Sequence, residues 1–176
     1  DELTIRTCHR SARGILLYRD YEMSVGSQYV GAACALWVLP DLQTRKLLNV
    51  THTPIVELKE TVGGLTPRIK KLTALHTPDD RTFVEDRLMR YSDTDVNAHV
   101  NNTKYADFAC DALDLAARRE GEFISELEIT YHEECQPGER IRISTANIQP
   151  DRFVHGEGAD QDSRFDVRLR LNIEGQ

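Results

Sequence analysis

The chain has 176 residues, a net charge of −7 and a hydrophobic share of 40%. Its length suits one large domain or two small ones, and its hydrophobic share is ordinary for a protein that buries a core. The acidic balance argues against nucleic acid as a partner. No apolar run approaches the roughly 18 residues that a membrane helix needs, and residues 1–10 are too polar for a signal peptide. We therefore expect neither a nucleic-acid nor a membrane partner.

The cysteines form neither a CxxC pair nor a regular disulfide framework: Cys8, Cys34, Cys110 and Cys135. Reduced thiols are typical of a cytoplasmic protein, and we expect that location here. A zinc site is conceivable from two of the cysteines and two histidines, namely Cys110, Cys135, His99 and His132. The spacing typical of zinc ligands is absent, so we expect no metal ion and no cofactor.

The first half of the chain predicts an antiparallel meander. Strand-like runs at Leu3–Cys8, Gly14–Met23 and Tyr29–Leu39 are separated by short turn-like pieces, with no amphipathic helix among them. A linker at residues 51–78 follows, in which a short helix can begin at Thr53-Pro54 and is broken at Gly63-Gly64. We therefore divide the chain into residues 1–50, the linker 51–78 and a unit at residues 79–176.

The second half predicts α+β order. A strand over Arg81–Tyr91 leads through a polar loop, Ser92–Val100, to a helix over Asn101–Arg118 that Asn101 or Asn102 can cap. Four strands then follow: Phe123–Glu133, Arg140–Ile148, Phe153–Glu157 and Arg164–Ile173. One apolar helix face against a long, curved antiparallel sheet is the hot-dog fold. The three early strands then predict a double hot-dog, with an incomplete first unit that lacks its opening strand, its helix and one further strand.

The densest polar cluster lies between the predicted strand and helix. Asp95, Asn97 and His99 fall in this loop, where an extended backbone lets alternate side chains face the same way. A helix N-terminus offers unpaired N–H groups that can stabilise a carbonyl oxygen becoming negative during acyl transfer. Asp and Asn also favour turns and caps, so a purely structural loop is the alternative interpretation.

A second polar cluster ends the strand that follows the helix. Alternation puts His132 and Glu134 on one face and Cys135 on the other, with Leu127 and Ile129. Glu134 is either a general base for a hydrolytic water or a solvated acid. Cys135 is either a nucleophile or a small buried side chain, and we expect His132 to lie at the surface. The remaining histidines occupy isolated polar contexts and are assigned no chemistry: His9, His52, His76 and His155.

The sequence resembles the acyl-ACP thioesterases, the plant and bacterial double hot-dog family. Four segments carry the resemblance: Tyr91–Tyr105 (YSDTDVNAHVNNTKY), Ile129–Cys135 (ITYHEEC), Ala12–Tyr21 and Ala35–Leu39. The D-x-N-x-H-V-N-N-x-x-Y motif with a downstream E-C is fairly specific, whereas its N-x-H-V-N-N core also occurs in related hot-dog thioesterases. The resemblance runs along nearly the whole chain, and we expect the natural protein to be longer by about 60–70 residues, the size of a strand–helix–strand unit.

The resemblance implies a role for each matched residue. Asn97 and His99 would position and polarise the thioester carbonyl, with Asp95 supporting them, and Glu134 would activate the attacking water. Cys135 matches a family position once assigned as the nucleophile, but we favour direct attack by water. The implied reaction is hydrolysis of fatty acyl-acyl carrier protein (ACP), which releases a free fatty acid and ends elongation.

The resemblance also implies an acidic partner, ACP carrying its acyl chain. A chain of net charge −7 then needs a local basic patch, and the candidates are Arg68, Lys70 and Lys71, or Arg118 and Arg119. A homodimer is possible, because hot-dog units pair through their sheets. Two alternatives remain, an acyl-CoA thioesterase and a non-catalytic module that binds acyl thioesters. A hot-dog dehydratase is disfavoured because no H-x-x-x-G-x-x-x-x-P pattern is present.

Overall fold

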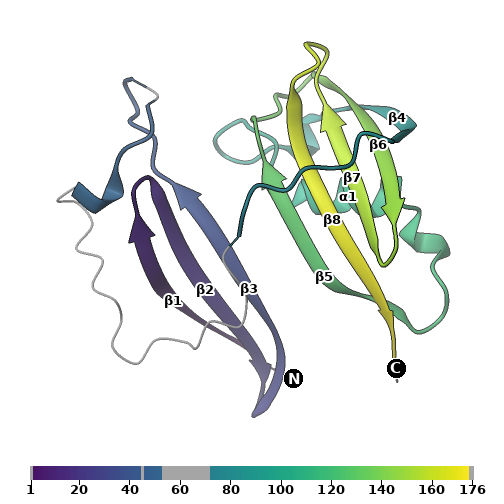
Figure 1. Cartoon of the computed structure of the whole chain (residues 1–176), viewed down its shortest axis with the longest axis horizontal. Helices are drawn as coiled ribbons and strands as arrows, with labels where there is room; N and C mark the ends of the chain where they lie inside the picture. Colours follow the sequence, from purple (N-terminus) through teal and green to yellow (C-terminus); the bar gives the residue numbers. More distant parts are fainter. Residues whose placement is uncertain (1, 45, 53–71, 175–176) are drawn as a thin grey trace. The chain divides into compact units, whose positions relative to one another are not determined.

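The computed structural model describes residues 2–44, 46–52 and 72–174 (Figure 1). The chain divides into two compact units, residues 1–73 and 74–176. The short helix predicted from Thr53 and the basic residues Arg68, Lys70 and Lys71 lie outside the described residues. Among the helices that are described, none has the length and apolar character that crossing a bilayer requires.

The first unit contains the predicted three-stranded meander. Its strands are β1 (Leu3–Arg13), β2 (Leu16–Val25) and β3 (Gln28–Val38), paired antiparallel in the order β1-β2-β3. Gly14 and Gly26 take the left-handed backbone conformation at the two tight turns, with φ of 60° and 57°, which costs glycine little. A 3-10 helix, η1 (Val50–His52), is fastened beside the first turn by a hydrogen bond from the Val50 N–H to the Gly14 carbonyl.

The second unit is a five-stranded sheet with one α-helix against it (Figure 1). Its strands are β4 (Thr82–Leu88), β5 (Glu122–Tyr131), β6 (Arg140–Ile148), β7 (Asp151–Glu157) and β8 (Ser163–Ile173). They pair antiparallel in the order β4-β6-β7-β8-β5. The helical pieces are η2 (Tyr91–Asp93), α1 (Lys104–Ala112) and η3 (Leu115–Ala117).

The core of the second unit lies between α1 and the inward face of the sheet. Tyr105, Phe108 and Ala109 are the buried residues of α1, spaced so that they share one side of the helix. They pack in one cluster with fully buried residues of three strands: Ile141, Ile143, Val154, Phe165, Val167 and Leu169. Alternate residues of β8 therefore supply part of the inward face, and the α+β hot-dog prediction for this unit is confirmed.

The helix is shorter than the predicted Asn101–Arg118. It begins at Lys104, with Thr103 as N-cap. The side-chain oxygen of Asn101 accepts hydrogen bonds from the Thr103 N–H and hydroxyl, at 2.9 and 2.8 Å, and this turn keeps the residues before Lys104 out of the helix. It ends at Ala112, and Asp114 then takes a left-handed conformation with φ of 49°, which Asp tolerates better than most residues. The resulting turn brings Leu115 back into the core.

Residues 74–80 cross the outer face of the sheet, which is the face away from α1 (Figure 1). The Leu75 N–H donates to Thr130 Oγ1 of β5 at 2.8 Å, and the Thr77 N–H donates to Asp166 Oδ1 of β8 at 3.1 Å. Part of the stretch that the sequence suggested as a linker is therefore hydrogen-bonded to the second unit. This covering segment helps to bury Asp166, which is 2% exposed.

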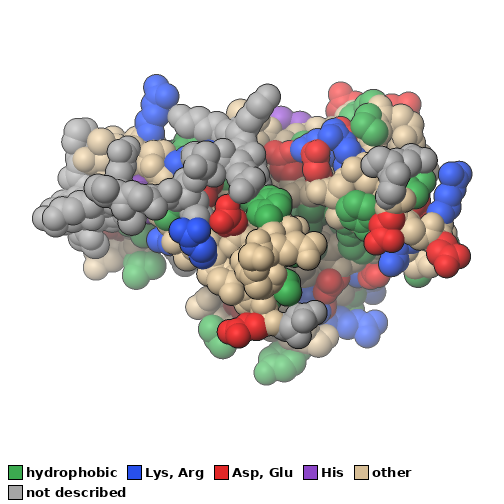
Figure 2. Space-filling view, turned by 90° about the horizontal axis from the view of Figure 1, so that it is seen from below, with side chains coloured by type: hydrophobic (Ala, Val, Ile, Leu, Met, Phe, Trp, Pro, Cys, Tyr) green, Lys and Arg blue, Asp and Glu red, His purple; other side chains and the backbone are tan. Residues whose placement is uncertain are grey.

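Charged side chains on the outer face are paired in a network. Arg168 binds Glu128 at 3.0 Å, while Arg170 binds Asp151 at 2.9 Å and Glu126 at 2.7 Å. Figure 2, which views the molecule from another side, shows Asp and Glu side chains beside Lys and Arg side chains in places on that surface too. The side chains of these pairs keep part of their surface in water, so each pair contributes little to the free energy of unfolding.

Gly156 on β7 provides a test of the packing between β7 and β8. A Cβ at this position would overlap the ring of Phe165, which is fully buried. We expect Gly156→Ala to lower the free energy of unfolding by about 1–3 kcal/mol or more, because the ring has no space to move into.

Urea unfolding monitored by circular dichroism measures the change. Gly31→Ala is the matched control, since that strand glycine faces only the flexible end of Met23 at an ordinary 3.4 Å. A Gly156→Ala protein as stable as the control would contradict the tight approach of the two strands.

Candidate active site

The polar loop before α1 is a closed turn. The Asp95 N–H donates to the His99 carbonyl at 2.9 Å, and the Ala98 N–H donates back to the Asp95 carbonyl at 3.1 Å. Ala98 takes the left-handed conformation, with φ of 63°. Asp95 also accepts from the Asn97 N–H at 2.8 Å through Oδ1 and from the Asn97 amide at 3.5 Å through Oδ2. The carboxylate thus fixes both the backbone and the side chain of Asn97.

Three hydrogen bonds fasten this loop and α1 to the end of β5 and the chain that follows it. The Val100 N–H donates to the Cys135 carbonyl at 3.2 Å, and the Cys135 N–H donates to the Tyr105 hydroxyl at 3.3 Å. The Tyr131 hydroxyl donates to the Asn102 carbonyl at 3.0 Å. Because Val100, Tyr105 and Cys135 are buried, their two hydrogen bonds hold the two segments in one register.

This register places His99 opposite Glu134. Nε2 of His99 lies 3.3 Å from Oε2 of Glu134, and the two side chains are 35% and 64% exposed. Both groups can therefore reach water and a substrate while they remain in contact. Asn97 lies on the same turn, two residues before His99, and is exposed. The structure thus brings four predicted site residues to two adjoining segments: Asp95, Asn97, His99 and Glu134.

Cys135 differs from these four in its surroundings. Its side chain is fully buried in the core cluster. Burial raises the pKa of the Cys135 thiol to about 11, although the hydrogen bond with Tyr105 acts in the opposite direction. A thiol with this pKa is almost entirely protonated at neutral pH, and the thiolate is the nucleophilic form.

The predicted alternation beyond Tyr131 is wrong, because β5 ends at that residue. The N–H groups of His132 and Glu133 both donate to the Arg164 carbonyl, which turns the chain away from strand geometry. The Arg164 guanidinium then binds the side chains of Glu133 and Glu139, each at 2.9 Å. Arg164 is thus a support of the Glu134 segment that the sequence did not reveal.

The N-terminus of α1 offers fewer free donors than predicted. The N–H groups of Thr103, Lys104 and Ala106 already donate within the loop, to Asn101 Oδ1, the Asn101 carbonyl and the Thr103 carbonyl. The side chains of Asn97 and His99 in the same loop can each donate a hydrogen bond.

The four residues considered for zinc are not brought together. Cys135 lies in the core on the inward side of the sheet, whereas His132 bonds Asp166 on the outer face at 2.8 Å. His155 also bonds Asp166, at 2.9 Å. Sequence reasoning missed this cluster, because its members come together only through the register of β7 and β8, which pairs His155 with Asp166.

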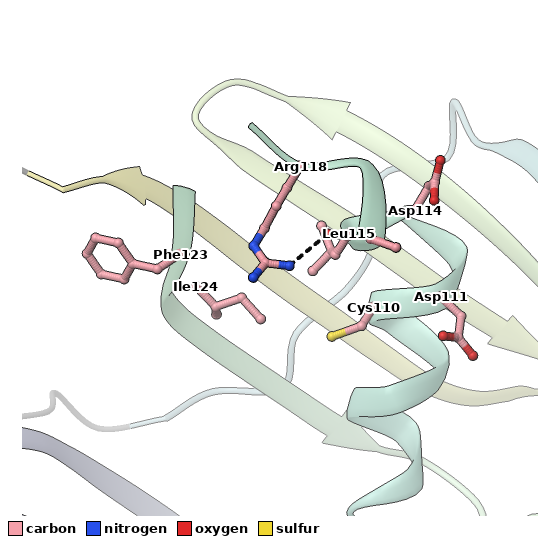
Figure 3. Close-up of a pocket in the computed structure, with 8 residues that line it drawn as sticks. Cys110, Asp111, Asp114, Leu115, Arg118, Phe123 and Ile124 are labelled. Carbon is pink, nitrogen blue, oxygen red and sulfur yellow. Dashed lines mark hydrogen bonds between the residues drawn. The ribbon is translucent and has the colours of Figure 1, made fainter. Parts of the chain in front are cut away.

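A cavity of about 530 Å³ lies at the C-terminal end of α1 (Figure 3). Leu115, Phe123 and Ile124 give it an apolar lining, and Arg118 lies across it with a hydrogen bond to the Leu115 carbonyl at 3.0 Å. The loop with His99 precedes the opposite end of the helix, so this cavity and the paired His99 and Glu134 are separate features.

Comparison with known proteins gives the family. A sequence profile for the acyl-ACP thioesterase C-terminal domain matches residues 76–176. The chloroplast acyl-[acyl-carrier-protein] hydrolase FATB2 of Cuphea viscosissima is 28% identical over 82% of this chain and 34% of its own length. The chloroplast oleoyl-acyl carrier protein thioesterase 1 of Arabidopsis thaliana is 24% identical over 100% of this chain and 52% of its own length. The chain therefore spans about half, or less, of these curated relatives.

Solved structures agree on the fold. An acyl-ACP thioesterase from Bacteroides thetaiotaomicron superposes with a TM-score of 0.80 at 17% identity, over 97% of this chain and 68% of that one. The 12:0-ACP thioesterase from Umbellularia californica gives 0.74 at 20% identity, over 98% of this chain and 66% of that one. Because the profile covers more than half of its residues, the chain belongs to the acyl-ACP thioesterase family.

Proposed function

We propose that this protein hydrolyses the thioester of a fatty acyl-ACP, releasing a free fatty acid and ending fatty acid elongation. The observation that carries the proposal is the apposition of His99 and Glu134 at 3.3 Å beside the Asp95–Asn97 turn. Family membership and the thioesterase names of the relatives support the same reaction. We also propose a cytoplasmic location and ACP as the partner.

The proposed reaction uses water as the nucleophile. Glu134 takes a proton from a water molecule as its oxygen attacks the thioester carbon. Asn97 and His99 donate hydrogen bonds to the carbonyl oxygen as it gains negative charge. The carbon–sulfur bond then breaks, the sulfur leaves on the carrier protein as a thiol after taking up the proton, and the carboxylic acid is released. Asp95 contributes by holding Asn97 in place.

In this proposal Cys135 is a structural residue. Its buried thiol, its raised pKa and its place in the core favour packing over attack. Its peptide group, by contrast, bonds both the loop and α1. The residue would therefore support Glu134 through the backbone.

For the carrier protein, we propose docking near the end of α1, at Arg118 and Arg119. The Arg118 guanidinium already donates to the carbonyls of Leu115 and Glu122, at 3.0 and 3.1 Å, so it is held in place. A fixed guanidinium keeps its positive charge available to an acidic partner at low entropic cost. The proposed homodimer would pair hot-dog sheets, and the oligomeric state in solution tests it.

Steady-state hydrolysis of medium- and long-chain acyl-ACP tests the reaction. We expect Glu134→Gln to lower kcat about 10²–10⁴-fold, because the amide keeps the size of the side chain but accepts no proton. Cys135→Ala should retain most of the activity. Glu133→Gln is the matched control from the same segment, since its amide oxygen can still accept from Arg164.

Three outcomes would contradict parts of the proposal. Loss of activity in Cys135→Ala with an unchanged fold would restore the nucleophile assignment. Preference for acyl-CoA over acyl-ACP would make the protein an acyl-CoA thioesterase. Tight binding of acyl-ACP by the unaltered protein without hydrolysis would leave a non-catalytic module.

The state of Cys135 is testable without substrate. A thiol pKa of about 11 against an ordinary value near 8.5 means at least about 100-fold less thiolate at pH 8. We expect iodoacetamide to modify Cys135 in the folded protein at least about a hundredfold more slowly than in the urea-unfolded chain. Mass spectrometry of proteolytic peptides measures both rates, and equal rates would mean that the thiol is accessible and ionised.

A further inference from the structure

The outer face of the second sheet carries a buried carboxylate with directed partners. Asp166 accepts from the His155 ring at 2.9 Å and from the Thr77 N–H at 3.1 Å through Oδ1. Its other oxygen, Oδ2, faces the His132 ring, with Nε2 at 2.8 Å. Burial alone would raise the pKa of Asp166, but the hydrogen bonds from His155, Thr77 and His132 outweigh it and lower the pKa below its usual range. The carboxylate is therefore ionised and fixed in orientation.

Two exposed histidines stand at the free side of this carboxylate. The rings of His76 and His132 are stacked, with centroids 5.8 Å apart and an angle of 20° between their planes. One ring nitrogen of each, together with a carboxylate oxygen of Asp166, lies within 4.8 Å of the others. These three residues belong to segments far apart in the sequence, namely the crossing segment, the chain after β5, and β8.

We propose that His76, His132 and Asp166 form a binding site for Zn²⁺. Tetrahedral zinc with ligands at 2.0–2.1 Å holds its donor atoms about 3.3 Å apart. Nε2 of His132 and Oδ2 of Asp166 lie 2.8 Å apart, which is within about 0.5 Å of this spacing. The exposed His76 ring can move inward. Binding requires the Nε2 lone pair of His132, so the Nε2 proton that Asp166 now accepts would be replaced by the ion.

The donor set selects the class of ion. Two imidazole nitrogens and one carboxylate oxygen suit zinc and its first-row neighbours, whereas Ca²⁺ and Mg²⁺ take oxygen ligands. His155 and Thr77 bind the oxygen of Asp166 that the ion does not need. Partners of this kind orient ligands in metal sites and strengthen binding.

The position of the ligands suggests what the ion would do. His76 lies between Leu75 and Thr77, whose N–H groups bond Thr130 and Asp166. An ion here would add a further connection between the crossing segment and the sheet, beyond these bonds and the one from the Thr77 hydroxyl to the Val154 carbonyl. Because it would bind the folded chain and no preformed site exists after unfolding, it would raise the stability of the second unit.

Isothermal titration of the whole, chelator-treated protein with ZnCl₂ tests the site, with a phosphine reductant present to keep the cysteines reduced. We expect one equivalent to bind and the thermal midpoint to rise with zinc concentration. His76→Asn should weaken the affinity at least about tenfold, since one of three protein ligands is lost. His76 is exposed, so this variant should fold with the midpoint of the metal-free protein.

His99→Asn is the matched control, because His99 and Glu134 form the other histidine–carboxylate pair considered for this protein. We expect it to bind Zn²⁺ within about twofold of the unaltered chain. The proposal is overturned if the unaltered protein binds no zinc, if His76→Asn binds it equally well, or if His99→Asn loses the binding. Titration with Co²⁺ adds a spectroscopic check, since a thiolate-to-cobalt charge-transfer band would place the ion on a cysteine instead.

Discussion

The candidate active site depends on the peptide groups of one buried residue. Cys135 accepts from the Val100 N–H through its carbonyl and donates to the Tyr105 hydroxyl through its N–H. Each bond contributes only about 0.5–1.5 kcal/mol net, but leaving either group unpaired in the core would cost about 1–3 kcal/mol. The paired arrangement is therefore strongly preferred over a shifted one, and it fixes His99 against Glu134.

The two faces of the second sheet bury different chemistry. The inward face is a continuous apolar cluster on α1, with Phe165, Val167 and Leu169 of β8 fully buried. On the outer face, Asp166 of the same strand is buried as an ionised group. An unpaired charge there would be very costly, so its two histidine partners and the Thr77 N–H are needed for the strand to keep this residue.

Much of the second unit could be predicted from the sequence, because its signals are local. Alternation along β8 and the spacing of Tyr105 and Phe108 follow from strand and helix periods, and the polar loop was recognisable by composition. The early end of α1 was not predictable from periodicity, since apolar residues continue past Asp114 while the backbone turns there. The end of β5 was missed for a similar reason, because the Arg164 carbonyl takes two successive N–H groups from another strand.

Contacts between distant segments were beyond the sequence. His76, His155 and Asp166 each look isolated along the chain, and His132 is grouped by sequence with Glu134 instead. Only strand register and the path of residues 74–80 join these four residues. The buried state of Cys135 was one of two open interpretations, because neighbours such as Leu127 share its predicted face. The backbone hydrogen bonds of Cys135 cannot be inferred from its residue type, since every residue except proline carries the same N–H and carbonyl groups.

The crossing segment also determines where the second unit can be separated for expression. A shortened chain that starts at residue 79, where the sequence suggests a boundary, would lose the N–H donors of Leu75 and Thr77. Asp166 would then be uncovered on a face that ordinarily buries it. Starting at or before Ala74 keeps this cover, so a few residues of apparent linker decide whether the unit is obtained with its outer face intact.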